Sequence, residues 1–166
     1  MFRTHTCNDL TEKNIGERVK LAGWVDTIRD HGGVIFIDLR DNYGTTQLVV
    51  NDDSMIKELP KESVIGVEGA VVMRSEDTIN EKLATGFIEV KIDKLEVLGK
   101  CTKMLPFEIA NSTATREDVR LKYRYLDLRN KHIHNNIILR SKIISFLRRE
   151  MEDMGFTEIQ TPILTA

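Results

Sequence analysis

The feature that most constrains the fold of this chain is an alternation of apolar and polar residues with a period of two in residues 34–40, repeated in residues 44–50. Successive side chains of a β-strand point to opposite faces, so each run predicts a strand with one apolar face. The pair Gly32 and Gly33 precedes the first run and predicts a tight connection, because glycine takes positive φ without steric cost. One face would carry Ile35, Ile37, Leu39, Thr46, Leu48 and Val50, and the other Phe36, Asp38, Arg40, Thr45, Gln47 and Val49.

Phe36 is an aromatic residue on the strand face that is expected to be exposed to solvent. Parity places Gln47 on the same face, and Arg29 precedes the glycine pair. A ring, a cation and an amide side by side would stack on and hydrogen-bond to an unpaired base. Arg29 has the parity of the apolar set, so this grouping requires a bulge, for which Gly23 is the candidate. The alternative is that a loop or a neighbouring domain covers Phe36.

Further strand patterns cover residues 18–25, 65–74 and 87–97, and residues 54–59 predict a short helix. The order is therefore strand, strand, strand, helix, strand, strand. This is the order of the OB-fold, a mainly β, five-stranded barrel that binds oligonucleotides with its second and third strands and the loops after strands one and four. Arg74 would begin the last of these loops. Because OB-folds also bind sugars and proteins, the topology alone does not predict RNA binding.

Composition limits the class of protein. With a formal net charge of -2, any RNA affinity would come from a local patch and not from the whole-protein field. Cys7 and Cys101 lack zinc-site spacing and a disulfide framework, as is typical of the reducing cytoplasm. No apolar run has transmembrane length and no signal peptide is present, so we expect a cytoplasmic protein with no membrane partner. We also expect no metal ligands and no phosphate loop.

The pattern changes after residue 99. We expect a barrel domain over residues 1–104, a hinge or linker over 105–131, and the start of a further domain over 132–166. The last of these has a helical apolar stripe from His132, a left-handed cap at Gly155 and then a strand over 156–163. One helix and one strand cannot build a second core, so we expect this to be the front part of a longer polypeptide.

Four segments carry a resemblance to a known family. They are residues 23–25, residues 29–41 with the run Arg-Asp-His-Gly-Gly, residues 121–129 with the run Tyr-Arg-Tyr-Leu-Asp-Leu-Arg, and residues 155–162, which end in Thr-Pro. Together they resemble the N-terminal region of bacterial aspartyl-tRNA synthetases, extending into the first signature motif of class II enzymes. Sibling lysyl and asparaginyl enzymes share the barrel and are the alternative.

The resemblance implies roles in reading an anticodon. Phe36 would stack on the middle base, with Arg29 and Gln47 bonding its edge, as suits RNA recognition by stacking. Arg74 would reach the third base, and Glu89 would accept hydrogen bonds from the first. Thr78 stands where some relatives carry asparagine, and His31 resembles the group that charges two transfer RNAs, so His31 and Thr78 are candidates for third-base discrimination.

The resemblance also implies the partners of the whole enzyme. These are tRNA(Asp), with tRNA(Asn) for the relaxed group, ATP and Mg²⁺ for aspartate activation, and a second copy of the chain at the motif that ends in Pro162. The second and third signature motifs do not occur in these residues, so we expect no catalytic residue, no bound cofactor and no catalysis by the chain alone. Two other classes of protein are alternatives. One is a generic single-strand-binding OB module, for which more aromatic residues and a basic net charge are expected. The other is a protein-interaction barrel.

Overall fold

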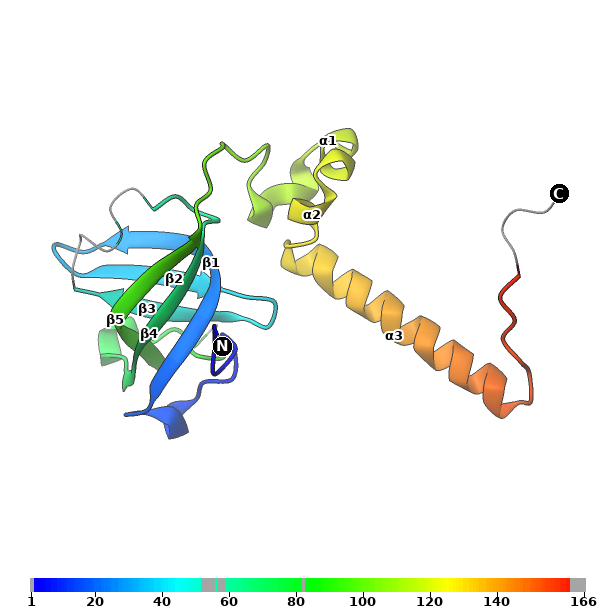
Figure 1. Cartoon of the computed structure of the whole chain (residues 1–166), viewed down its shortest axis with the longest axis horizontal. Coiled ribbons are helices and arrows are strands. Elements are labelled where there is room, and N and C mark those ends of the chain that lie inside the picture. The colour runs from blue at the N-terminus through cyan, green and yellow to red at the C-terminus, as the bar shows by residue number, and fades with distance from the viewer. Residues whose placement is uncertain (1, 52–55, 57–58, 82, 162–166) are drawn as a thin grey trace. The chain divides into compact units, whose positions relative to one another are not determined.

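The computed structural model describes residues 2–51, 56, 59–81 and 83–161. The chain divides into two compact units, Met1–Met104 and Leu105–Ala166, which are described separately (Figure 1). The short helix predicted over residues 54–59 lies largely outside the described residues.

The first unit is a closed barrel of five strands in the order β1-β2-β3-β5-β4 (Figure 1). The pairing of β3 with β5 is parallel, and the other pairings are antiparallel. The predicted mainly β OB-fold is confirmed. The strands are β1 (Arg18–Asp30), β2 (Ile35–Arg40), β3 (Thr45–Val50), β4 (Val64–Met73) and β5 (Ile88–Gly99), with the 3-10 turns η1 (Glu12–Asn14) before β1 and η3 (Glu76–Thr78) between β4 and β5.

The barrel interior consists of the alternating apolar residues that the sequence pattern predicts. Burial of each large aliphatic side chain stabilises the fold by about 1.5–3 kcal/mol relative to exposure, so the shared inner face holds the strands in register. The fully buried members include Leu21, Val25, Ile37, Leu39, Leu48, Ile65, Val71, Ile88 and Val90.

A β-bulge in β1 brings Arg29 to the outer face of the sheet. Val25 pairs with Leu39 and Thr27 with the adjacent Asp38, so Asp26 is the extra residue. Beyond the bulge Arg29 lies opposite Phe36. The predicted bulge therefore exists, but three residues after Gly23.

Gly23 has a different structural reason. A Cβ at this position would lie 2.4 Å from the carbonyl oxygen of Arg40 on the neighbouring strand. Arg40 also holds the bulge, because its Nη1 donates to Asp26 Oδ1 at 2.7 Å and its Nη2 to Glu62 Oε1 at 2.6 Å.

The outer face of β3 is more covered than the alternation predicts. Gln47 and Val49 are only 6% and 8% exposed. The β4–β5 loop reaches β3, where the Thr85 hydroxyl donates to the carbonyl of Thr45 at 2.7 Å. This face is therefore the floor of a pocket and not an open sheet surface.

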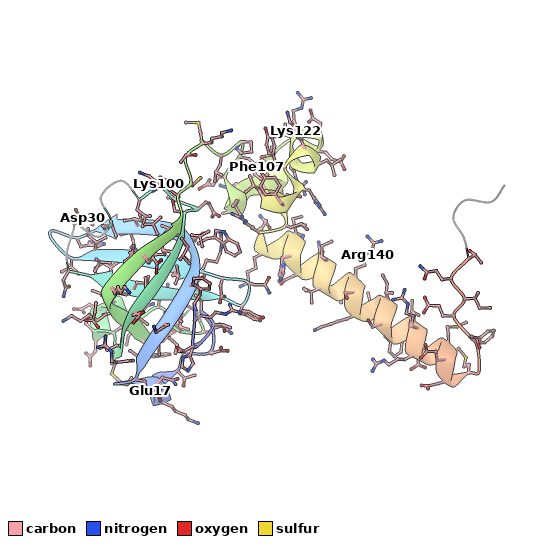
Figure 2. All side chains as sticks on the ribbon, viewed as in Figure 1. Glu17, Asp30, Lys100, Phe107, Lys122 and Arg140 are labelled. Atoms are coloured by element: carbon pink, nitrogen blue, oxygen red, sulfur yellow. The ribbon has the colours of Figure 1, made fainter. Side chains whose placement is uncertain are left out.

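The second unit begins with short helical segments that the sequence analysis treated as a linker. They are η4 (Ile109–Ala114), α1 (Glu117–Lys122) and α2 (Arg124–Asp127), around a small core of Phe107, Ile109 and Leu126. Figure 2 shows Phe107 among these segments. Asp127 is fully buried and accepts hydrogen bonds from Arg120 and Arg124.

The long helix α3 (Lys131–Asp153) confirms the predicted helical stripe. The side chain of Asn130 caps its first turn, and Gly155, at φ 88°, ends it in the predicted left-handed conformation. No residue of α3 is buried within the part of the chain described. None of the helices described is long and apolar enough to span a membrane.

The strand predicted from Phe156 is wrong over residues 156–161. Residues 156–161 form no regular element. A strand requires a neighbour for its backbone groups, and no described strand pairs with this segment. Pro162 lies outside the described residues.

Candidate nucleic-acid interface

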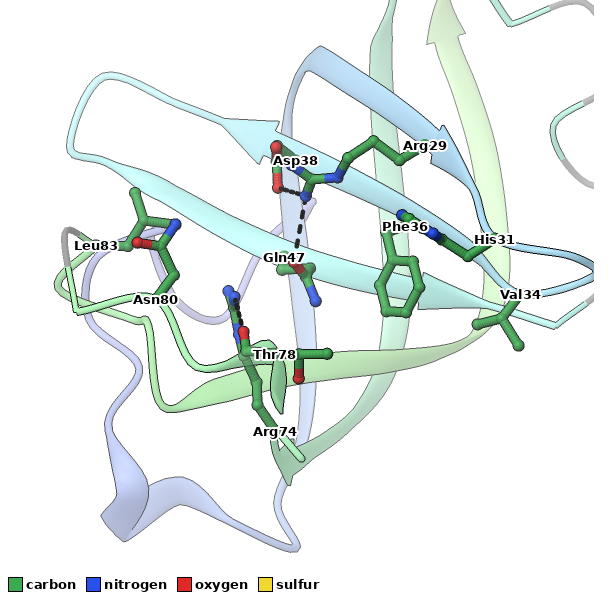
Figure 3. Close-up of a pocket in the computed structure, with 10 residues that line it drawn as sticks. All are labelled: Arg29, His31, Val34, Phe36, Asp38, Gln47, Arg74, Thr78, Asn80 and Leu83. Atoms are coloured by element: carbon green, nitrogen blue, oxygen red, sulfur yellow. Dashed lines mark hydrogen bonds and ion pairs between the residues drawn. The ribbon is translucent and has the colours of Figure 1, made fainter. Parts of the chain in front are cut away.

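A pocket of about 550 Å³ opens on the outer face of β2 and β3 (Figure 3). The β1–β2 hairpin forms one wall and the β4–β5 loop the other. Six of the predicted site residues line it, and Glu89 lies outside the lining. The lining residues are Arg29, His31, Val34, Phe36, Asp38, Gln47, Arg74, Thr78, Asn80 and Leu83.

Phe36 supplies the aromatic surface of the pocket. Its position on β2 alternates with the buried Ile35 and Ile37, which anchor the strand in the core and direct the phenyl ring outward. His31, at the hairpin tip, packs edge-on against it with ring centroids 5.6 Å apart. Gly32 and Gly33 have φ values of 69° and 104°, which explains why glycines form this tip.

A line of hydrogen bonds crosses the pocket floor beside Phe36 (Figure 3). The Arg29 guanidinium donates to Asp38 Oδ1 at 2.8 Å and to Gln47 Oε1 at 3.2 Å. Gln47 Nε2 in turn donates to Glu89 Oε2 at 2.8 Å. Arg29, Phe36 and Gln47 are therefore brought together as predicted. Glu89, expected at a separate base, is bonded to Gln47 and supports its amide.

Arg74 is buried at the end of β4, with only 4% of its surface exposed. Its Nε donates to the carbonyl of Ile88 at 2.9 Å and its Nη1 to the carbonyl of Thr78 at 3.3 Å. Desolvation lowers the pKa of the Arg74 guanidinium, an effect opposed by the negative charges of Glu89 and Asp38. Nη2 is buried without a hydrogen-bond partner among the described residues.

Sequence reasoning missed four of the lining residues, namely Val34, Asp38, Asn80 and Leu83. Asp38 shares the face of Phe36, so the period-two pattern contained its signal. Asn80 and Leu83 belong to a loop without periodicity. Their position depends on a turn in which the backbone N–H of Asn80 donates to the carbonyl of Gly86 at 3.1 Å.

The charges of the site favour a base over a phosphate. Two arginines, Arg29 and Arg74, face two carboxylates, Asp38 and Glu89. A nearly neutral set of this kind offers little attraction to a free phosphate. It offers instead a ring for stacking and an array of donors and acceptors for a base edge.

Two family models match the chain in sequence order. An OB-fold nucleic acid binding domain matches residues 19–98, and the class II tRNA synthetases of the D, K and N type match residues 116–166.

Individual relatives agree with this order of domains. Proteins named aspartate–tRNA(Asp/Asn) ligase from Pelagibacter ubique and Agrobacterium fabrum are 52% and 51% identical over 99% of the chain. The chain spans 28% of the length of each of these relatives.

Solved structures show the same fold. The asparaginyl-tRNA synthetase of Pyrococcus horikoshii matches 99% of this chain and 39% of its own, with a TM-score of 0.82 and 28% identity. The aspartyl-tRNA synthetase of Entamoeba histolytica, at 21% identity, has a TM-score of 0.82 over 95% of this chain and 39% of its own and supports the fold alone. The barrel, the two matched domains and the identity across the whole chain confirm the predicted resemblance: this chain belongs with the class II tRNA synthetases of the D, K and N type and is similar along its length to the N-terminal part of proteins named aspartate–tRNA ligase.

Proposed function

We propose that the barrel binds the anticodon loop of tRNA(Asp) and stacks the middle base of the anticodon on Phe36. The observation that carries the proposal is the convergence of Phe36, Arg29 and Gln47 in one pocket. Single-stranded RNA is recognised by bases that leave the stack, lie on aromatic rings and expose their edges to polar side chains. Gln47 bonds the middle base through its amide, and Arg29 bonds the same edge.

The outer anticodon positions have their own residues in this proposal. Arg74 approaches the third base from the end of β4, beside Thr78 in the loop. Glu89 accepts a hydrogen bond from Gln47 with Oε2, and its other carboxylate oxygen accepts hydrogen bonds from the donors of a first-base guanine.

We further propose that the site accepts the anticodon of tRNA(Asn) as well. The anticodons of the two transfer RNAs differ at the third base. His31 lines the pocket from the hairpin wall and Thr78 from the loop wall, and neither side chain carries a carboxylate or a guanidinium that would favour a single base. The relatives named above carry both transfer RNAs in their names.

The remaining functions belong to the whole protein. We propose that it attaches aspartate to tRNA in the cytoplasm, using ATP and Mg²⁺, and that it acts as a homodimer whose interface includes α3 and Pro162. The exposed apolar stripe of α3 supports a partner for this helix, since patches of this kind mark interaction surfaces. No described residue is assigned to ATP or to Mg²⁺.

The test is the binding of this chain to anticodon stem-loops with the triplets GUC, GUU and an unrelated triplet at fixed moderate salt. Wild type binds GUC selectively, and Phe36→Ala weakens this binding by about 5- to 150-fold, the range of one lost base–aromatic stack. Tyr43→Ala removes an exposed aromatic outside the pocket and is the matched control, with unchanged affinity.

Each alternative gives a different result. Equal and salt-sensitive binding of all three stem-loops would indicate a generic single-strand-binding module. No binding by a folded chain would favour a protein-interaction barrel. A strong preference for GUC over GUU would restrict the enzyme to tRNA(Asp).

A further inference from the structure

The hydrogen bonds on the pocket floor form a continuous network with a carboxylate near each end. Asp38 accepts from the Thr27 hydroxyl at 2.8 Å and from Arg29 at 2.8 Å. Arg29 continues to Gln47 at 3.2 Å, and Gln47 to Glu89 at 2.8 Å. The network therefore joins residues of β1, β2, β3 and β5.

This hydrogen-bond network determines which way the amide of Gln47 points. A guanidinium only donates, so it requires the amide oxygen, and a carboxylate only accepts, so it requires the amide nitrogen. A reversed amide would place an NH₂ group against Arg29 and an oxygen against Glu89. Both contacts would become repulsive, so the observed orientation is held from both sides.

The fixed amide gives the floor an ordered pattern of donors and acceptors. After its contacts within the protein, Gln47 retains one lone pair on Oε1 and one hydrogen on Nε2, and Arg29 retains further N–H groups beside Oε1. The order is donor, acceptor, donor. The Watson–Crick edge of uracil presents the complement: a carbonyl, an N–H and a second carbonyl. Cytosine presents a ring nitrogen lone pair in the centre, opposite the amide oxygen.

We propose that Asp38 and Glu89 are positioning residues that set the preference of this site for uracil over cytosine by holding Arg29 and the Gln47 amide in this order. The inference rests on the proposed anticodon function. Asp38 is otherwise out of place, because a carboxylate lining an RNA-binding pocket repels the phosphates of every RNA. Its side chain is only 13% exposed and contacts Arg29, so it acts on the base through the guanidinium.

The test compares the affinities of this chain for stem-loops with GUC and GCC, which differ only at the middle base. Asp38→Asn keeps the shape and an oxygen for Thr27, but removes the charge that orients Arg29. The ratio of the two affinities falls at least about tenfold, the effect of one weakened charged hydrogen bond. Binding of GCC stays the same or strengthens, because a negative charge has been removed from an RNA surface.

Asp30→Asn is the matched control. Asp30 is exposed at the end of β1, outside the pocket lining, and its loss changes the charge equally. Both affinities rise together and their ratio is unchanged. Glu89→Gln is the second variant: an amide at this position can accept or donate, so Gln47 is held by Arg29 alone and the ratio falls again, by a smaller factor.

The outcomes separate the two levels of the proposal. A wild-type chain without preference for GUC over GCC overturns the proposed function and this inference with it. A wild-type preference that survives in both Asp38→Asn and Glu89→Gln overturns the inference alone. An equal loss of both affinities in Asp38→Asn assigns the residue a purely structural role and also overturns it.

Discussion

The two compact units differ in where their large apolar side chains lie. The barrel encloses its own, with Leu21, Ile37 and Leu48 fully buried, whereas Ile144 and Leu147 of α3 are 38% and 54% exposed. Cross-strand burial therefore holds the barrel, and local hydrogen bonds and caps hold the helix. The pocket is therefore supported by contacts within the barrel, while no described residue covers the apolar side chains of α3.

Truncation of core residues tests this comparison with the largest expected effect. Ile37→Ala lowers the free energy of unfolding by about 2–5 kcal/mol, because it leaves a cavity between β1, β2 and β3. Ile144→Ala in α3 removes the same atoms and changes it by less than about 0.5 kcal/mol. Urea unfolding measures both, followed for the barrel by the fluorescence of Trp24, the one tryptophan, and for α3 by helical circular dichroism. Similar losses in the two variants would mean that α3 is packed as tightly as the barrel.

A glycine substitution tests whether tight packing extends to the pocket loop. In Gly86→Ala the new Cβ would lie 1.8 Å from the carbonyl oxygen of Asn80, so the loop must move, at about 1–3 kcal/mol. Affinity for the GUC stem-loop falls with it, because Asn80 lines the pocket. Gly66→Ala is the control, since its Cβ would meet only Leu98 at 3.5 Å. Unchanged affinity in Gly86→Ala would show that the loop does not shape the site.

The cap of α3 tests the role of local bonds in the second unit. The Asn130 side chain accepts from the backbone of His132 and Ile133 and donates to the carbonyls of Ile109 and Ala110. Asn130→Ala destabilises this unit by about 1–2 kcal/mol, detected as loss of helical circular dichroism on heating. Asn136→Ala, in the exposed body of the helix, has no such effect. A change in the unfolding of the barrel with Asn130→Ala would mean that the effect of the cap is not confined to the second unit.

Lowering the pH has the smallest expected effect on the stability of the second unit. Burial alone would raise the pKa of Asp127, but hydrogen bonds and charges from Arg120 and Arg124 outweigh it and hold the pKa below its ordinary value. A lowered folded pKa means that the contribution of Asp127 is complete above the unfolded pKa and is lost as pH falls through the folded one, below about pH 4. Amide hydrogen exchange then accelerates in the second unit. Asp127→Asn removes this pH dependence, and an equal acceleration in wild type and variant would reject the assignment.

The barrel could be predicted because its information is periodic. Ile35, Ile37 and Leu39 identify one strand and its inner face, and the parity of Arg29 identified a bulge before its position was known. The placement of Phe36 and Gln47 on the same outer face of neighbouring strands followed from the same counting. The common face of Arg29, Phe36 and Gln47 could be predicted because these residues lie on regular strands.

The remainder depends on contacts without period. The burial of Gln47 results from a loop that folds over β3, and no local pattern encodes it. The helices over residues 109–127 were missed because segments of four to six residues are too short for a 3.6-residue repeat to emerge. The strand predicted from Phe156 had the right composition, but composition does not supply the neighbouring strand that it requires.

The bulge at Asp26 means that β1 has one residue more than its ladder with β2 requires. If one residue near this position were deleted, the ladder could close with Val25 still facing inward and Arg29 still facing outward, because the extra residue would simply disappear. An added residue has no such solution, since it must enlarge the bulge or turn Arg29 into the core. Length variation among related barrels is therefore expected to be one-sided here, with losses accepted at the bulge and gains confined to the hairpin tip.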